Sequence, residues 1–317
     1  MVVRPQSSGS PFVSVIVPHL DDVVRLSRLM SALSAQTWPR DAFEIIVADN
    51  GSGCGIDVVR AAARGARVVA APERGAGPAR NHALAFATGS ILAFTDSDCL
   101  PDPDWLAQGV AALAAADFVG GAMTVTVGDA ARPSPSEAFE LVFAFDNERY
   151  VAQLGFSVTA NLFVRRDVMA AVGGFRTGVP EDLGWCRRAR ALGYRIGYAS
   201  GATVQHPARE GFEALARKWR RLTDEAFADW CDGGQSRALW ALRALGVLVS
   251  PVWDGARVAR SSKLRGAGQR MVAAAVLLRL RALRSRWMMA QAFSPNTRVT
   301  ARAPDVPLVQ TGPAQQI

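Results

Sequence analysis

Residues 90–98 read SILAFTDSD, an apolar run that ends in two carboxylates, Asp96 and Asp98. The apolar residues predict a buried strand, and positions i and i+2 of an extended chain point the same way. Asp96 and Asp98 are therefore expected side by side at the end of that strand. Such a pair of hard oxygen ligands suits Mg2+ or Mn2+. A solvated turn is the other interpretation of an isolated pair of this kind.

The same succession of strand and helix recurs on the N-terminal side of this segment. Its pattern predicts strands at residues 12–17, 43–48, 67–71 and 90–95, separated by helices at 23–36, 56–64 and 77–88. This alternation is typical of βαβ units in a parallel sheet. Ligands bind such sheets at the carboxyl ends of the strands. Pro18, Asp49 and Asp96 follow three of those ends, so they are expected on one rim.

The rest of the chain changes character near residue 210. Before that point the pattern predicts a strand at 118–127, a loop at 128–136, a helix at 137–153, a strand at 158–164, and helices at 166–171 and 181–192. From residue 212 onward only helical periodicity appears, with breaks at residues 233–234 and 250–251. We predict a disordered tail at 1–11, an α/β domain at 12–210, a basic helical region at 211–294 and a disordered tail at 295–317.

The composition is that of a globular protein with one or two domains. Of the 317 residues, 50% are hydrophobic and 20% are charged, which excludes wholesale disorder, a collagen-like repeat and a small disulfide scaffold. The net charge of +8 is uneven, because residues 1–208 carry 18 − 20 = −2 and residues 209–317 carry 18 − 8 = +10. The basic third of the chain therefore indicates an anionic partner.

Cysteine spacing and apolar segments predict the compartment. The four cysteines lie far apart without the spacing of a zinc site, so we expect reduced thiols. The N-terminal residues lack the apolar run of a signal peptide, and no apolar segment is long enough for a confident membrane span. The predicted location is cytoplasmic, either free or attached peripherally to the inner face of the plasma membrane.

The basic region leaves two interpretations open. Residues 235–292 hold 11 basic side chains, one acid and three tryptophans, a composition that suits an anionic membrane surface. The alternative is a helical subdomain in which arginine stems cover apolar surface of the body. On a helical wheel, the arginines between residues 270 and 286 fall on two opposite sides, which is not a clean amphipathic face. Nucleic acid is not expected, because no recognition helix or aromatic platform accompanies the charge.

Other polar residues at predicted element ends have both a structural and a functional interpretation. Asp49 either forms a turn or accepts a hydrogen bond from a nucleobase or ribose. Arg80 either makes a structural ion pair or binds phosphate. Glu181 and Asp182 either cap a helix or supply a general base. His206, at the end of a short strand, is either structural or a metal ligand.

Taken in order, these pieces resemble the family 2 glycosyltransferases. Members of that family are inverting enzymes of the GT-A fold that transfer sugar from a nucleotide donor. The resemblance covers about residues 12–210. Its matching segments are residues 13–18, 46–52, 77–81, 91–98, 161–166, 173–175, 181–182 and 193–196, together with His206.

The resemblance implies an α/β fold, with a GT-A type Rossmann-like sheet flanked by helices and an all-helical basic C-terminal extension. It implies Asp182 as catalytic base, Asp98 as ligand of Mn2+ or Mg2+ with His206 as a further ligand, and Asp96 facing the ribose or the metal. On the donor side it implies that Asp49 contacts the nucleobase, commonly uracil, that Pro18 shapes the pocket and that Arg80 lies near the diphosphate. The implied partners are a UDP-sugar and a saccharide or lipid-linked acceptor in the synthesis of cell-envelope polysaccharide or glycolipid, without nucleic acid.

Two positions depart from the family pattern. Gly184 stands where family members often carry a second acid after the base, which leaves acceptor handling open, with Glu181 as the acceptor-side candidate. Asp21 stands where the family often has Asn, so we expect it to take that donor-binding place. Two other functions stay open: a nucleotidyltransferase, although the acidic segment after the first strand replaces the expected basic, glycine-rich loop, and a non-catalytic nucleotide-sugar-binding scaffold. A nicotinamide dehydrogenase is not expected, because no GxGxxG follows that strand.

Overall fold

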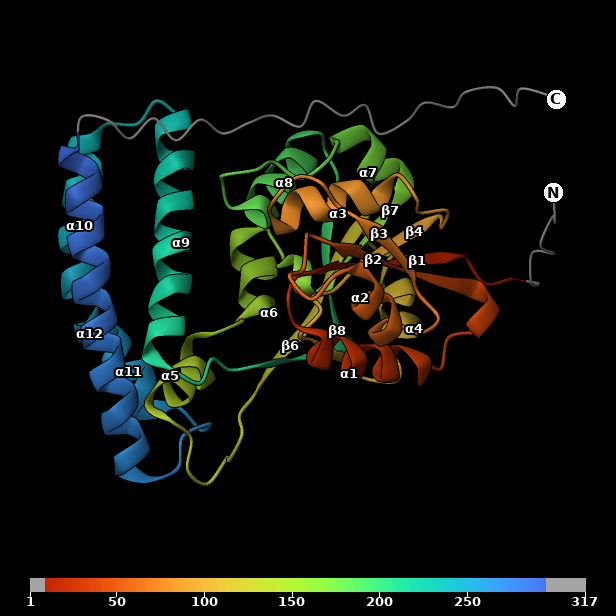
Figure 1. Cartoon of the computed structure of the whole chain (residues 1–317). Helices are drawn as coiled ribbons and strands as arrows, with labels where there is room; N and C mark the ends of the chain where they lie inside the picture. The colour runs from red at the N-terminus through yellow and green to blue at the C-terminus, as the bar shows by residue number, and fades with distance from the viewer. Residues whose placement is uncertain (1–8, 295–317) are drawn as a thin grey trace.

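The computed structural model describes residues 9–294 and shows a curled eight-stranded sheet with helices on both faces, beside a layer of helices (Figure 1). This is the mixed α/β architecture with a helical extension that the sequence predicts. Of the two predicted tails, residues 1–8 and 295–317 lie outside the described residues. Residues 9–11 precede the first strand.

Residues 13–94 alternate between strand and helix as predicted. Its elements are β1 (Val13–His19), α1 (Val23–Ser34), β2 (Phe43–Asp49), α2 (Ile56–Ala62), β3 (Arg67–Ala70), α3 (Ala76–Leu84) and β4 (Ile91–Phe94). β2 pairs in parallel with β1 and β3, and β1 pairs in parallel with β4. The predicted parallel sheet is confirmed for these four strands.

Residues 100–207 add strands that make the sheet a mixture of parallel and antiparallel pairs. Its elements are β5 (Leu100–Pro101), α4 (Trp105–Ala112), β6 (Phe118–Thr126), α5 (Pro135–Phe143), α6 (Asn147–Arg149), β7 (Leu162–Arg165), α7 (Arg166–Val172), α8 (Glu181–Ala191) and β8 (Ile196–Pro207). The strand order is β3-β2-β1-β4-β7-β6-β8-β5. β7 runs antiparallel to both β4 and β6, whereas β6 and β8 are parallel.

Two predicted elements differ from the structure. The helix predicted at 137–153 breaks after α5, because Ala144 is extended and Phe145 takes a left-handed conformation with φ 51°. The Phe145 ring packs 4.6 Å from the His206 ring, so a tertiary contact overrides helix propensity there. The strand predicted at 158–164 begins as a 3-10 turn and becomes β7 only at Leu162. Helix α4 was not predicted.

The sheet separates two apolar layers. Along β1, Val15 and Val17 pack in the layer that includes α1, α2 and α4, while Ile16 points into the layer of α3, α7 and α8. This alternation fixes the register, because a shift by one residue would turn the apolar side chains to the wrong face. The fixed register brings the strand ends to one edge.

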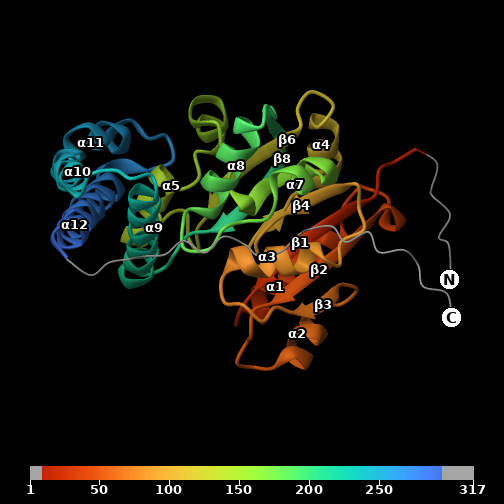
Figure 2. The same cartoon turned by 90° about the horizontal axis from the view of Figure 1, so that it is seen from above.

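Four long helices form the layer beside the sheet: α9 (Phe212–Asp232), α10 (Arg237–Val249), α11 (Pro251–Arg260) and α12 (Gly266–Phe293). The breaks predicted at 233–234 and 250–251 are confirmed, with φ 66° at Gly234 and Pro251 opening α11. α5 packs into this layer, where Phe139 joins Leu215 and Leu277 in one apolar cluster. In Figure 2, α5 and α9 lie between the sheet and the outer helices. Within residues 9–294 no helix has the length and apolarity to cross a membrane.

Candidate active site

A cavity of about 700 Å³ opens at the edge where β1, β2 and β4 end. Of the residues singled out in the sequence, those that line it are Pro18, Arg80, Asp96, Asp98, Glu181, Asp182 and His206. Asp21 and Asp49 do not line it. The convergence of polar groups on one rim is therefore confirmed for most of the predicted set.

Strand pairing explains how these residues meet. β1 and β2 end together, because His19 lies opposite Asp49. β4 ends three residues earlier, with Phe94 opposite Ile16, so the loop that carries Asp96 and Asp98 begins beside the last residues of β1. The two residues of β5 pair antiparallel with β8, with Leu100 opposite Gln205. That pairing brings the loop after β4 against the end of β8, and with it Asp98 against His206.

Arg80 ties two parts of the rim together. Its side chain is 2% exposed, and one guanidinium nitrogen donates to Asp96 Oδ1 at 2.5 Å while the other pairs with Glu181 Oε1. Gly77, one turn earlier in α3, permits this approach, because a Cβ there would collide with Glu181. Arg80 thus joins the end of β4 to the start of α8, and its contact with a diphosphate stays a prediction. Its Nε has no partner among the described residues.

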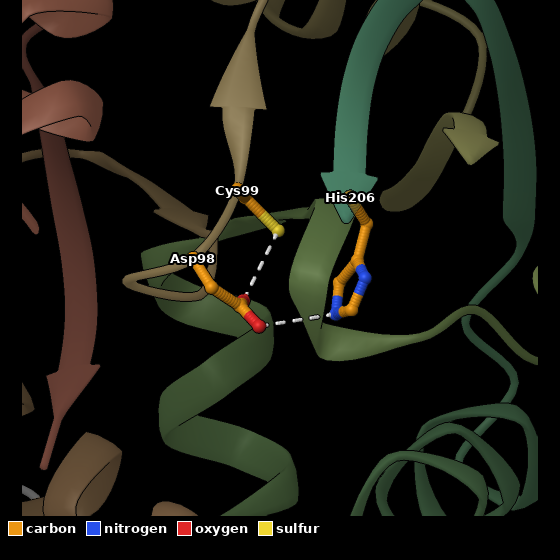
Figure 3. Close-up of side chains that lie close together, drawn as sticks. All are labelled: Asp98, Cys99 and His206. Carbon is orange, nitrogen blue, oxygen red and sulfur yellow. Dashed lines mark hydrogen bonds and ion pairs between the residues drawn. The ribbon is translucent and has the colours of Figure 1, made fainter. Parts of the chain in front are cut away.

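Asp98, Cys99 and His206 form the candidate metal centre (Figure 3). One ligand atom from each lies within 4.8 Å of the others, and His206 Nε2 is 3.5 Å from Asp98 Oδ2. His206 Nδ1 lies 2.7 Å from the Pro207 carbonyl oxygen. A carbonyl only accepts, so Nδ1 is the donor and Nε2 is the nitrogen that faces Asp98.

The donor set of this cluster is hard rather than thiolate-rich. Burial raises the pKa of the Cys99 thiol well above its ordinary value, which keeps the thiol protonated at neutral pH. Burial also raises the pKa of Asp98, while the nearby His206 lowers it. A carboxylate and an imidazole nitrogen remain as ligands, with open positions toward the cavity. Such a set fits Mn2+ or Mg2+ and leaves room for phosphate oxygens.

Asp182 has the properties of a general base. It lies in the first turn of α8 and lines the cavity. Burial, and then the charge of Glu181, raise the pKa of Asp182 to about 6, while the backbone N–H of Leu183 donates to its Oδ1 at 2.7 Å. A carboxylate with a pKa near the working pH is well matched to accept a proton from a hydroxyl group. The sequence left this acid pair open between helix capping and catalysis.

Asp49 and Asp21 hold a loop instead of facing the cavity. Asp49 is 4% exposed and accepts from the Ser52 hydroxyl at 2.5 Å, and that hydroxyl in turn accepts from the Asp21 N–H at 2.9 Å. Asp21 Oδ1 accepts from the Gly53 N–H at 2.6 Å. These bonds fasten the loop after β2 beside the end of β1. Asn50, next to Asp49, lines the cavity in its place.

The sequence did not predict a charge cluster around the buried Glu140, beside the cavity. Glu140 of α5 is 1% exposed and accepts from the Arg209 N–H at 2.6 Å and from Lys218 Nζ at 2.9 Å. Lys218 also lies over the Phe145 ring, 5.2 Å from its centroid. Arg209 and Lys218 both line the cavity. Glu140 therefore holds two cations on the side of the cavity that includes His206.

Helix α9 supplies a second group that the sequence did not reveal. Lys218, Leu222 and Glu225 line the cavity at spacings of four and three residues, which places them on one helical face. Burial raises the pKa of Glu225 to about 7, opposed by Arg221 and reinforced by the charges of Glu181 and Asp182. In the sequence, the available signal was that the charged Lys218 and Glu225 share one helical face with the apolar Leu222.

Aromatic side chains between residues 143 and 156 complete the apolar part of the wall. Phe143, Phe145, Tyr150 and Phe156 all line the cavity, and the rings of Tyr150 and Phe156 stack with centroids 5.0 Å apart. Flat aromatic surfaces bind sugar rings and apolar chains alike. This wall faces the same space as Asp182.

Comparison with known proteins identifies the family. The family described as "Glycosyl transferase family 2" matches residues 14–173. The glycosyltransferase AglE of Haloferax volcanii is 32% identical over 255 residues, which is 77% of this chain and 82% of AglE. The chain belongs to glycosyltransferase family 2. The family 2 resemblance is thus confirmed, and with it the general activity of a glycosyltransferase.

Two further proteins are similar to this family 2 chain in different ways. Validoxylamine A glucosyltransferase of Streptomyces hygroscopicus subsp. jinggangensis is 30% identical over 155 residues, 47% of this chain and 36% of that protein. A solved structure of the mannosyltransferase PcManGT from Pyrobaculum calidifontis, in complex with GDP-Man and Mn2+, superposes with a TM-score of 0.58 at 24% identity, over 90% of this chain and 87% of that one. The likeness to PcManGT confirms the GT-A fold.

Proposed function

We propose that this family 2 glycosyltransferase moves a sugar from a nucleotide sugar, with UDP as the first expectation, to an acceptor hydroxyl with inversion and with the help of Mn2+ or Mg2+. The observation that carries the proposal is that the half-buried Asp182 and the pair of Asp98 and His206 line one cavity. A base and a metal centre on one cavity are what a one-step displacement at a sugar carbon needs.

Asp182 is proposed to accept the proton of the acceptor hydroxyl. As that proton moves to Asp182 Oδ, the acceptor oxygen forms a bond to the anomeric carbon and the bond to the diphosphate oxygen breaks. The electron pair of the broken bond stays on the diphosphate. Because entry and departure occur on opposite faces, the configuration inverts. A pKa of about 6 leaves Asp182 mostly ionised at neutral pH and so ready for this step.

Asp98 and His206 would hold the divalent cation. The fit rests on the orientation of His206 Nε2 toward Asp98 Oδ2 and on the absence of a thiolate at the buried Cys99. When bound, the cation would neutralise charge that develops on the leaving diphosphate. Arg209 and Lys218, held by Glu140, add positive charge on the same side. Arg80 acts as a positioning residue that keeps Asp96 and Glu181 in place.

The donor side would use residues at the ends of β1, β2 and β4. Pro18 and Asp96 line the cavity, where they would bound the nucleoside, with Asp96 toward the ribose or the metal. Asp49 and Asp21 are proposed to act from behind, by fixing the loop that presents Asn50. A direct contact of Asp49 with the base would require the loop after β2 to move, because Asp49 is 4% exposed and does not line the cavity.

The acceptor side would use Glu181, the aromatic wall and helix α9. We propose a saccharide or a lipid-linked acceptor, made for the cell envelope at the inner face of the plasma membrane. The apolar aromatic wall and the basic helices next to it support this class of acceptor. The four free thiols agree with a reducing compartment.

A donor panel tests the proposal. The protein is incubated with UDP-sugars and GDP-sugars, the latter because PcManGT was solved with GDP-Man and Mn2+. Released nucleoside diphosphate is measured with Mn2+, with Mg2+ and with a chelator. We expect release from at least one donor and loss of release on chelation. Asp98→Asn should weaken Mn2+-dependent donor binding, whereas Asp57→Asn, a 90% exposed carboxylate, should not.

Three outcomes would contradict the proposal. Full turnover in the chelator would show that the reaction does not need a metal. Unchanged Mn2+ dependence in Asp98→Asn would show that Asp98 is not a metal ligand. Donor binding without turnover, under any acceptor fraction from cell envelopes, would favour the nucleotide-sugar-binding scaffold. Anomeric proton couplings in the NMR spectrum of the product test inversion.

A further inference from the structure

Exposed apolar side chains gather on α10 and the first turn of α11, and we call this set the apolar face. It consists of Leu239, Leu242, Leu245, Leu248, Val249, Val252 and Trp253, each between 47% and 76% exposed. In α10 these positions lie three residues apart or next to each other, and at 100° per residue they cover about half of the helix, away from the buried Trp240 and Ala244. Val252 and Trp253 continue the exposed apolar residues in the first turn of α11. In Figures 1 and 2 these helices belong to the layer farthest from β1 and β2.

The opposite side of α10 already has its partners. Trp240 and Ala244 are buried in a cluster with Phe227 of α9 and Met288 of α12. α10 is therefore apolar both toward the protein and toward solvent. A helix that is apolar all round is normally buried or in contact with lipid, and a large exposed apolar patch marks an interaction site.

Cations follow the apolar face along the chain. Arg260, Lys263 and Arg265 follow at the end of α11 and in the turn to α12, and all three are exposed. In the part of the chain that the structure describes, their side chains make no ion pair. Exposed apolar side chains together with cations that make no ion pair are the composition of surfaces that bind anionic lipid headgroups.

The structure also explains why the arginines of α12 fall on two sides. Arg281 donates to Asp254 at 2.7 Å, and Arg281 and Arg284 both lie over the Trp219 ring, at 5.7 and 5.0 Å. These two arginines serve packing between α12 and α9. The packing interpretation of the basic region therefore holds for Arg281 and Arg284.

We propose that the apolar face, with Arg260, Lys263 and Arg265, is the surface that docks on an anionic lipid bilayer. A second copy of the chain fits less well. Residues 235–292 hold 11 cations and a single acid, Asp254, which is already paired with Arg281. A second copy would set cations against cations, whereas anionic lipid provides the opposite charge. This inference deepens the proposed membrane partner and does not depend on turnover.

The docked orientation has a consequence for the acceptor. α10 packs on α9 through Trp240 and Phe227, and α9 lines the cavity through Lys218 and Glu225. A bilayer under α10 and α11 would thus be one helix away from the proposed acceptor wall. This is where a lipid-linked acceptor would present its head group.

Vesicle sedimentation tests the surface. The full chain is mixed with phosphatidylcholine vesicles, with and without phosphatidylglycerol. We expect binding to the anionic vesicles that falls as salt rises. Leu242→Gln with Trp253→Gln should weaken binding by about tenfold or more, because each change removes a large inserted apolar group. The matched control is Val24→Gln with Leu192→Gln, which changes side chains of similar exposure, 63% and 59%, on the α/β body.

A second pair of variants tests the charge. Arg260→Gln with Lys263→Gln should abolish the preference for phosphatidylglycerol, whereas Arg28→Gln with Arg64→Gln, two exposed arginines of the body, should keep it. No binding of the wild type to anionic vesicles would overturn the proposal, and so would equal losses in the controls. A dimer in light scattering that dissociates in the Leu242 and Trp253 variant would assign the face to a second copy. Nucleoside diphosphate release, measured on the same variants in solution, should be unchanged.

Discussion

Asp182 and Glu181 are adjacent carboxylates whose surroundings give them different tasks. Glu181 pairs with Arg80, which also holds Asp96. Asp182 is half-buried and receives a hydrogen bond from the Leu183 N–H. Glu181 is thereby held in an ion pair, whereas Asp182 can exchange a proton with a substrate in the cavity. This division makes Asp182 the acid to expect as base.

The rate of transfer should depend on pH through Asp182. Its pKa is about 6, raised by burial and by Glu181, and the base acts only when deprotonated. The sign is therefore a loss of kcat/KM as pH falls below about 6, approaching tenfold per pH unit, with a plateau above about 7. Donor binding with Mn2+, measured over the same range, separates this effect from protonation of the metal ligands. A kcat/KM that is flat down to pH 5 would contradict the assignment.

Glu225→Gln provides a sharper check on the same profile. Glu225 lines the cavity, and its charge and that of Asp182 oppose each other's ionisation. Removing the charge of Glu225 makes Asp182 easier to ionise, so the acidic limb of the profile should move to lower pH. An unmoved limb would mean that a group outside this pair controls the rate.

How far the sequence predicts the site depends on the distance between partners along the chain. Asp96 and Asp98 follow a recognisable apolar strand, so their place at a strand end was predictable. Lys218 was not, because its role arises from Glu140, 78 residues earlier, and an isolated lysine in a basic helix has no pattern that reveals such a partner.

At the scale of elements, the short strand β5 positions the residues of the candidate metal centre. β5 has two residues, Leu100 and Pro101, too few to show alternation. Its pairing with β8 nevertheless brings Asp98 to His206. The sequence predicted both residues as ligands through a family resemblance, but it contained no local signal for the pairing that joins them. The left-handed Phe145 is similar, since its conformation is set by packing on His206.

The contact of α5 with α9 should contribute measurably to stability. Glu140→Gln would leave Lys218 and Arg209 without their buried counter-charge, and we expect a loss of about 3 kcal/mol in the free energy of unfolding at neutral pH. The burial cost on Glu140 is outweighed by Lys218 and Arg209, which lower its pKa, so its contribution should fade as pH falls below about 4.5. Urea unfolding measures both effects. Glu213→Gln, at a 93% exposed carboxylate, is the control and should change stability little.

At the scale of the whole molecule, the basic helices are part of the enzyme body. α11 and α12 supply Val258, Leu277 and Leu280 to the cluster that also buries Phe139 of α5 and Leu215 of α9. The predicted division at residue 210 stays a prediction, but the apolar contacts of α5 cross it. The net charge of +10 in residues 209–317 therefore serves several purposes, among them packing on Trp219 and the lining of the cavity.

A truncation tests this unity. A chain that ends at Gly233 lacks α10, α11 and α12 and would expose Phe139 and Leu215. Each large apolar side chain left uncovered costs about 1.5 to 3 kcal/mol, so we expect aggregation or loss of cooperative unfolding. A chain that ends at residue 294 retains every described contact and serves as the control. Cooperative unfolding of the shorter chain, followed by near-UV circular dichroism, would show that the helices are dispensable.

The central claim is that Asp182 is the base of a sugar transfer in this cavity. It is tested most directly by nucleoside diphosphate release from the best donor, with Mn2+ and an acceptor fraction, in the wild type and in Asp182→Asn. We expect a fall in turnover of roughly a thousandfold, with donor affinity kept and a melting temperature no lower than that of the wild type, because the folded state disfavours the charge that is removed. Turnover in Asp182→Asn within a few fold of the wild type would contradict it.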